Sequence, residues 1–194
     1  MRVAGLVLAA GGGRRFGMPK ALVRHDGQLL VDRSVAVLRA AGCAPVVVVL
    51  GAAADDVRAR ADLDGVVVVD NPDWTTGMGS SLRAGLAALA ETGAAATVVI
   101  LVDMPGMTAA AVRRVAADAG RAELVMAGYD NGRSGHPVLL GRDHWAGVAA
   151  LAVGDVGARP YLRAHTGAVR VVPCADVADD EDLDFAPHAW GAPE

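Results

Sequence analysis

The sequence predicts a single α/β domain with a doubly wound, mostly parallel sheet and a small antiparallel excursion at one edge. Short runs of Val, Ile and Leu alternate with stretches of helical periodicity, which is the pattern of successive βαβ units. Several of these runs contain no polar residue, as expected for strands that helices cover on both faces. The length of 194 residues suits one domain, and no linker-like segment divides residues 1–194.

Seven strands and four helices are expected. The strands cover residues 3–8, 45–50, 66–69, 97–102, 124–127, 137–140 and 169–172. The helices cover residues 32–41, 55–61, 80–91 and 108–119, with Thr108 as the N-cap of the last. A tight-turn signal, Asp-Asn-Gly at 130–132, predicts that the segments on either side of it pair as antiparallel strands.

The composition excludes several classes of protein. Eighteen Lys and Arg against 22 Asp and Glu give a formal net charge of −4, whereas a nucleic-acid groove requires a basic face. No apolar run approaches the roughly 18 residues that a membrane span needs. We therefore expect a soluble, cytoplasmic protein without nucleic-acid or membrane partners. The two cysteines, Cys43 and Cys174, form no CxxC pair, so neither a zinc knuckle nor a disulfide framework is implied, and Cys43 is expected as a small buried or half-buried filler.

A glycine-rich, basic loop follows the first expected strand, in the position where parallel sheets bind their ligands. The three glycines at 11–13 can present backbone N–H groups to an anion. Arg14, Arg15 and Lys20 can neutralise phosphate charge. The loop matches neither a Walker A sequence nor a complete GxGxxG dinucleotide fingerprint. The prediction is a polyphosphate site, and the alternative is a flexible basic loop.

Asp103 is the sharpest single candidate for catalysis or metal binding. It ends the apolar run at 97–102, where a charge is costly unless it projects from the carboxyl end of the strand. Mg²⁺ is commonly held by one or two carboxylates together with substrate phosphates. The alternative is an N-cap or turn aspartate.

The expected helix at 80–91 starts close to a second candidate binding feature, Gly-Met-Gly-Ser-Ser at 77–81. Free N–H groups and two hydroxyls at a helix start suit an anion or the edge of a base. Simple N-capping by Ser80 is the alternative. Trp74, just before this segment, either stacks on a ligand or fills a loop.

Five motifs resemble those of MobA-like nucleotidyltransferases, in particular their molybdenum cofactor cytidylyltransferase branch. In chain order they are LAAGGGRRFGMPK at 8–20, NPDWTTGMGSSLRAG at 71–85, LVDMP at 101–105, GHPV at 135–138 and GDVGAR at 154–159. The resemblance covers roughly residues 3–183. It implies a Rossmann-like nucleotidyltransferase fold and Mg²⁺-dependent transfer of CMP from CTP to the terminal phosphate of a molybdopterin-type cofactor, with release of pyrophosphate. A molybdenum hydroxylase is the implied recipient of the product.

The resemblance also implies roles for individual residues. The implied catalytic residues are Lys20, Arg15 and Asp103, of which Asp103 is also the metal ligand. The implied nucleotide-binding residues are Ala10, Gly11, Gly12, Gly13, Arg14, Gly79, Ser80 and Ser81. His136 and Arg159 are implied to bind the acceptor, with Asp155 as a further candidate.

Two positions depart from the family pattern. Gly13 stands where the family has a serine, and Ala178 stands where the family often has an aspartate that helps to hold a metal. Asp176 or Asp179 could replace that aspartate, or the acidic segment at 176–183 is a solvated run of charges.

Alternative functions remain open at this point. They are transfer to another phosphorylated molecule such as a sugar phosphate, guanylyl transfer to molybdopterin, and a non-catalytic cofactor carrier. The presence of both Lys20 and Asp103 favours an enzyme, because a carrier has no need of Asp103.

Overall fold

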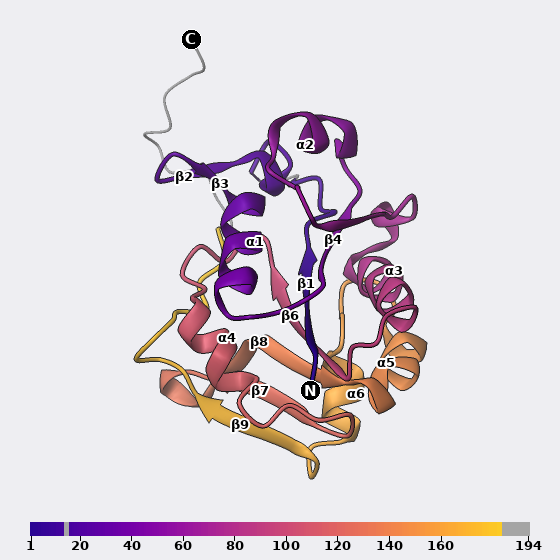
Figure 1. Cartoon of the computed structure of the whole chain (residues 1–194), viewed down its shortest axis with the longest axis vertical. Helices are drawn as coiled ribbons and strands as arrows, with labels where there is room; N and C mark the ends of the chain where they lie inside the picture. The colour runs from indigo at the N-terminus through magenta and orange to yellow at the C-terminus, as the bar shows by residue number, and fades with distance from the viewer. Residues whose placement is uncertain (14–15, 184–194) are drawn as a thin grey trace.

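The computed structural model describes residues 1–13 and 16–183, without the side chain of residue 131. Within them, seven strands form one sheet in the order β5-β4-β1-β6-β8-β7-β9 (Figure 1). In chain order these strands are β1 (Val3–Leu8), β4 (Val46–Leu50), β5 (Val67–Asp70), β6 (Ala96–Leu101), β7 (Leu124–Gly128), β8 (Ser134–Gly141) and β9 (Val169–Pro173). A small hairpin of β2 (Arg24–His25) and β3 (Gln28–Leu29) was not expected from the sequence.

The sheet is mostly parallel, as predicted. β1 pairs in parallel with both β4 and β6, β4 pairs with β5, and β7 pairs with β9. β8 runs antiparallel between β6 and β7, which confirms the predicted antiparallel pair. This excursion occupies the half of the sheet that ends at β9. The carboxyl ends of β1, β4 and β6 therefore meet at one edge of the sheet.

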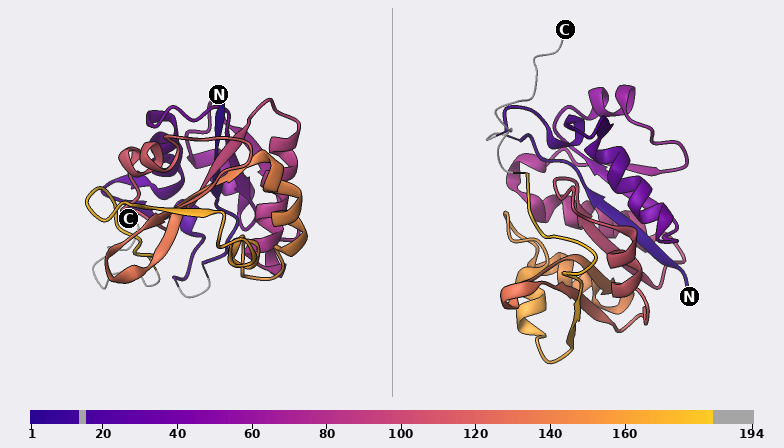
Figure 2. Two further views of the ribbon diagram at one scale, coloured as in Figure 1. Left: turned by 90° about the horizontal axis from the view of Figure 1, so that it is seen from below. Right: turned by 90° about the vertical axis from the view of Figure 1, so that its left-hand side faces the viewer.

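Helices cover both faces of the sheet (Figure 2, left). They are α1 (Leu30–Ala40), α2 (Ala54–Arg60), α3 (Met78–Ala90), α4 (Ala109–Val115), α5 (Trp145–Leu151) and α6 (Arg159–Ala164). The first four correspond to the predicted helices, and Thr108 caps α4 by accepting a hydrogen bond from the backbone N–H of Ala111. α5 and α6 were not predicted, because α5 consists mostly of Ala and Gly and α6 has a proline in its first turn, so neither shows a clear apolar stripe.

Alternating residues of the central strands build two separate cores. In β4, Val46 and Val48 pack on the side of α1 and α4, whereas Val47 and Val49 pack on the side of α3 and α5. Since both faces are buried, the strand carries no polar alternation in sequence.

Two predictions drawn from composition can be compared with the fold. Cys43 is buried, as expected, and burial raises the pKa of its thiol to about 11. Among the helices of residues 1–13 and 16–183, none is both long and apolar enough to cross a membrane.

Candidate active site

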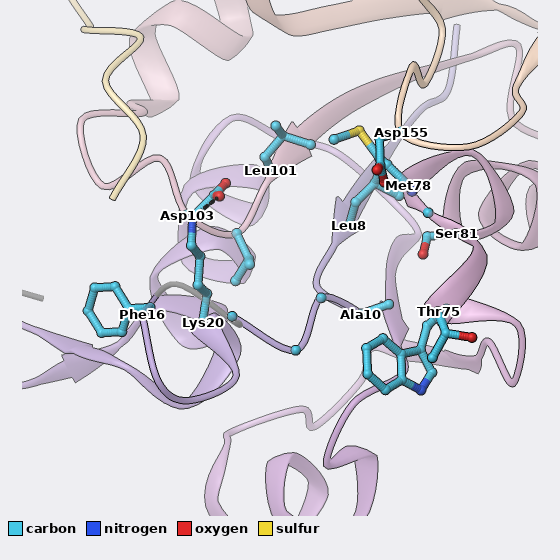
Figure 3. Close-up of a pocket in the computed structure, with 16 residues that line it drawn as sticks. Leu8, Ala10, Phe16, Lys20, Thr75, Met78, Ser81, Leu101, Asp103 and Asp155 are labelled. Carbon is cyan, nitrogen blue, oxygen red and sulfur yellow. Dashed lines mark hydrogen bonds and ion pairs between the residues drawn. The ribbon is translucent and has the colours of Figure 1, made fainter. Parts of the chain in front are cut away.

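A cleft of about 400 Å³ opens beyond the carboxyl ends of β1 and β6 (Figure 3). Its walls come from the loop at residues 10–13 (the glycine loop), the end of β6, the start of α3 and the loop between α5 and α6. The lining residues are Leu8, Ala10, Gly11, Gly12, Gly13, Phe16, Lys20, Trp74, Thr75, Gly77, Met78, Ser81, Leu101, Val102, Asp103 and Asp155.

Lys20 and Asp103 form an ion pair inside this cleft. Lys20 Nζ donates to Asp103 Oδ2 at 2.7 Å, and the two side chains are 17% and 21% exposed. Figure 3 shows them reaching toward each other from separate segments of the chain. Of the alternative interpretation, the N-cap is wrong because Thr108 caps the helix that follows, whereas Asp103 does lie in a turn, directly after β6. The structure thus brings the two residues together, and their catalytic role stays a prediction.

Gly13 determines the path of the glycine loop. Its φ of +58° is left-handed, and its carbonyl accepts hydrogen bonds from the backbone N–H groups of Phe16 and Gly17. A Cβ at this position would lie 1.9 Å from the carbonyl oxygen of Met18, so no side chain fits. Glycine in place of the family serine therefore has a steric reason here.

Trp74 packs against the glycine loop. A Cβ at Gly12 would lie 3.1 Å from its ring, and one at Gly51 would lie 2.6 Å from its Cβ. Of the two interpretations left open by the sequence, loop filling is the one that the contacts support, although the ring also forms part of the cleft wall. The predicted phosphate ligands Arg14 and Arg15 lie outside the described residues.

The start of α3 contributes Ser81 to the cleft, whereas the predicted ligands Gly79 and Ser80 do not line it. Asn71 Nδ2 donates to Ser80 Oγ at 2.8 Å and to Ser81 Oγ at 3.0 Å, and all three residues are buried. Ser80 Oγ also donates to the carbonyl of Gly77, the N-cap residue, so Ser80 does not cap the helix. Asn71, which the sequence analysis did not single out, therefore holds Ser81 at the wall. A polar residue at the end of an apolar strand was the available signal.

The loop at 152–155 is fastened to α3. Met78 N donates to Asp155 Oδ1 at 3.2 Å. Arg83 donates to the carbonyl of Ala152, which ties α3 to this loop. These bonds hold Asp155 on the wall of the cleft.

A smaller pocket of about 80 Å³ adjoins the cleft and shares Asp155 with it. Both predicted acceptor residues, His136 and Arg159, line this pocket. His136 Nδ1 lies 3.0 Å from the carbonyl oxygen of Val99, and it carries the proton because a carbonyl only accepts. Most of the remaining wall is apolar. The structure therefore places the predicted acceptor residues beside the predicted nucleotide site.

The pH dependence of stability should report the burial of His136. Desolvation lowers its pKa below the usual 6.5, although the hydrogen bond to Val99 and the charge of Asp103 act in the opposite direction. Below pH 6.5 the unfolded state therefore binds more protons than the native state. We expect the free energy of unfolding to fall between pH 7 and pH 5, by at most about 1.4 kcal/mol per pH unit. In urea titrations, His136→Gln should lose less of its free energy of unfolding between pH 7 and pH 5 than the unsubstituted protein. An equal loss in the two proteins would contradict His136 as the cause.

The acidic segment at 176–183 packs against the loop that carries Asp103. Leu183 N donates to the Asp103 carbonyl at 2.9 Å. Thr108 Oγ1 donates to the carbonyl of Val177 at 2.7 Å. The backbone of the segment is therefore part of the fold around the cleft, while the side chains of Asp176, Asp179, Glu181 and Asp182 are exposed to solvent.

The aspartates of this segment have separate neighbours. Asp176 accepts two hydrogen bonds from Arg114, at 2.5 and 3.0 Å. Asp180 is 16% exposed and pairs with Arg133 at 2.7 Å. Asp179 packs on the loop that follows β6. The contacts of Asp176 do not support a metal-binding role, because Arg114 engages both of its oxygens.

Comparison with known proteins relates the whole sequence to one family. The model of the MobA-like NTP transferase domain matches residues 5–169. The chain is 38% identical to the nicotine blue oxidoreductase of Paenarthrobacter nicotinovorans, over 94% of this chain and 92% of that protein. It is 35% identical to the molybdenum cofactor guanylyltransferase of Rhodobacter capsulatus, over 94% of each chain.

Solved structures give the same picture. The crystal structure of Rv0371c from Mycobacterium tuberculosis H37Rv superposes with a TM-score of 0.82 at 31% identity, over 95% of this chain and 93% of that one. Its complex with manganese gives 0.78 at 30% identity, over 95% and 92%. The extent of these matches, together with the family model, shows that the chain belongs to the MobA-like NTP transferase family.

Proposed function

We propose that this protein moves CMP from CTP to the terminal phosphate of a molybdopterin-type molecule and releases pyrophosphate. The Lys20–Asp103 pair, which shares one cleft with the glycine loop, carries the proposal. A cation, a carboxylate and backbone N–H donors in one cleft are what a triphosphate with a divalent ion requires. Membership of the family supports nucleotidyl transfer, and the five sequence motifs support the cytidylyl branch.

The reaction makes modest chemical demands on the protein. An oxygen of the acceptor phosphate attacks the α-phosphorus of CTP. The bond between the α-phosphorus and the oxygen that bridges it to the β-phosphorus breaks, and the electron pair of that bond leaves with pyrophosphate. The acceptor phosphate is largely ionised near pH 7, because its second pKa is about 6, so no strong base is needed. Lys20 and the backbone N–H groups of residues 11–13 would hold the phosphates and neutralise their charge.

Asp103 suits a Mg²⁺ ion. It presents one carboxylate on the cleft wall, and oxygen ligands of this kind are those that Mg²⁺ prefers. Residues 1–13 and 16–183 hold no group of three or more His, Cys, Asp or Glu side chains that could bind a metal. Substrate phosphates and water would therefore complete the set of ligands. When bound, the ion would neutralise charge on the triphosphate and on the leaving pyrophosphate.

The smaller pocket would take the acceptor. Arg159 can grip a phosphate in a fork, and a mostly apolar wall suits the flat rings of a pterin. His136, with its lowered pKa, would make hydrogen bonds as a neutral group. In this proposal the nucleotide-bearing product then passes to a molybdenum hydroxylase.

Guanylyl transfer is the second candidate, because the Rhodobacter relative, which matches 94% of this chain, is named a guanylyltransferase. The deciding experiment measures pyrophosphate release from CTP, GTP, ATP and UTP with Mg²⁺, with and without molybdopterin. We expect release only with the acceptor, and a kcat/KM for CTP at least about tenfold above that for GTP. A higher kcat/KM for GTP than for CTP would mean that the protein transfers GMP and not CMP. Turnover only with a sugar phosphate would contradict the acceptor.

The name of the Paenarthrobacter relative raises oxidoreduction as a different activity. Phe16 occupies the third glycine position of a dinucleotide fingerprint in this chain, which does not favour a nicotinamide dinucleotide. Oxidation of NADH and NADPH with a quinonoid dye as acceptor tests this activity. We expect no oxidation above the rate without protein, and sustained oxidation would contradict the proposal.

Two glycines offer a matched test of the two binding regions. Gly11 lines the cleft and Gly135 lines the smaller pocket, and a Cβ at either would meet no atom within 4 Å. Gly11→Ala should raise the KM for CTP about tenfold and Gly135→Ala the KM for the acceptor, since each methyl group takes space from one ligand. The free energy of unfolding should change by less than about 1 kcal/mol.

Gly93→Ala is the control for these variants, because its Cβ also meets open space and it lines neither pocket. It should leave both KM values unchanged. If each of the two site variants raised both KM values equally, the division into a nucleotide site and an acceptor site would be wrong.

A further inference from the structure

We propose that Lys20 holds the Asp103 carboxylate until a nucleotide arrives, so that the divalent-cation site at Asp103 forms only together with the nucleotide. This inference deepens the proposed nucleotidyl transfer and rests on it. It assigns Lys20 two successive partners, the carboxylate before binding and phosphate oxygens after it.

The first observation is that Lys20 engages the carboxylate that a metal would use. Its ammonium lies 2.7 Å from Asp103 Oδ2, in a cleft where both side chains are largely shielded from water. A divalent ion bound to the same carboxylate would face a positive charge at close range, which is strongly unfavourable away from bulk water. Lysine and metal therefore compete for Asp103.

The second observation is the choice of residue. Lys20 is the only lysine in the chain, and the other 17 of its 18 basic Lys and Arg residues are arginines. An arginine grips a carboxylate with a rigid fork, whereas an ammonium on a four-carbon stem is a compact charge that can change partners. The single lysine therefore places a charge that can exchange between two anions beside Asp103.

The third observation is that the backbone at Lys20 is anchored, so a change of partner would involve the side chain alone. Lys20 begins a short 3-10 helix, Lys20–Leu22. Ala21 and Leu22 are buried, and Val23 N donates to the Lys20 carbonyl, so this helix is anchored. The glycines at 11–13 line the same cleft as Lys20. Phosphates held by the loop would thus lie close enough to receive the ammonium.

Binding of Mn²⁺ without nucleotide tests the competition. Lys20→Met keeps an unbranched stem and removes the charge, and we expect it to bind Mn²⁺ at least about tenfold more tightly than the unsubstituted protein. Free Mn²⁺ is measured by electron paramagnetic resonance. Adding Asp103→Asn to this variant should abolish the gain. Arg163→Met removes one exposed charge outside both pockets and should leave the affinity within about twofold of the unsubstituted value.

The outcomes separate this inference from the proposed function. If Lys20→Met binds Mn²⁺ no more tightly, the competition is refuted, even if the protein releases pyrophosphate from CTP. If Mn²⁺ binding tightens while no nucleotide supports pyrophosphate release, the function fails and the competition between Lys20 and the metal stands.

A second measurement needs no variant. Protein labelled with [ε-¹³C]lysine gives a single lysine resonance, because the chain has one lysine. We expect MgCl₂ alone to leave this resonance in place, and MgCl₂ with CTP or GTP to shift it as the ammonium changes partner. An equal shift with MgCl₂ alone would overturn the inference.

Discussion

Replacing Asp103 by Asn should lower the rate of nucleotidyl transfer at least about 10³-fold while leaving the fold intact. The amide has the shape of the carboxylate but lacks the charge that would hold Mg²⁺ against the phosphates, and the loss of such a group is worth several kcal/mol in the transition state. Because the side chain lies on a cleft wall and is 21% exposed, the substitution leaves no cavity in the core. Pyrophosphate release under saturating CTP and acceptor measures the effect, and circular dichroism checks the fold.

Asp143→Asn is the matched control for this prediction. Asp143 also pairs with a basic side chain, Arg121 at 2.6 Å, but it lies outside both pockets. It should retain the unsubstituted rate within about twofold, since an exposed ion pair contributes little. A rate for Asp103→Asn within threefold of that control would contradict the role of Asp103.

Gly13→Ala should lower kcat/KM for the nucleotide at least about 10²-fold and destabilise the protein by about 1–3 kcal/mol. The new Cβ would lie 1.9 Å from the backbone carbonyl of Met18, which a side-chain rotation cannot relieve. The loop must therefore open, and Lys20, which follows it, would move away from Asp103. Steady-state kinetics and urea denaturation give the two numbers.

Gly17→Ala distinguishes the cost of a left-handed backbone conformation from the cost of a steric clash. Gly17 also has a left-handed φ, +89°, but a Cβ there would meet no atom within 4 Å. This variant should show only the backbone cost of about 1 kcal/mol and a modest kinetic effect. If both variants lost the same activity, the contact with Met18 would not be what shapes the loop.

The elements that the sequence predicted are those with a strong local signal. The strands at 3–8 and 46–50 are unbroken apolar runs because helices cover both of their faces, and this pattern is visible without coordinates. α5 and α6 have no comparable signal, since α5 is mostly Ala and Gly and α6 has a proline in its first turn, and both depend on packing against the rest of the fold. The hairpin of β2 and β3 has only two residues in each strand.

The candidate site shows the same division. The rule that ligands bind beyond the carboxyl ends of parallel strands was enough to predict that Lys20 and Asp103 share one cleft, and their contact confirms this. The motif at the start of α3 could not reveal which residues face the cleft, because Ser80 turns to Gly77 and Ser81 does not. The partners of the acidic segment arise from contacts distant in sequence, such as that between Leu183 and Asp103, and no local pattern encodes them.

A crystal structure with Mn²⁺ and a CTP analogue that cannot be cleaved between its α- and β-phosphates is the most direct measurement of how this cleft works. We expect an anomalous peak for manganese at ligand distance from the Asp103 carboxylate. We also expect Lys20 Nζ to donate to a phosphate oxygen beside the glycine loop. Manganese bound away from Asp103, with the Lys20–Asp103 pair intact and the triphosphate outside the cleft, would contradict the proposed chemistry.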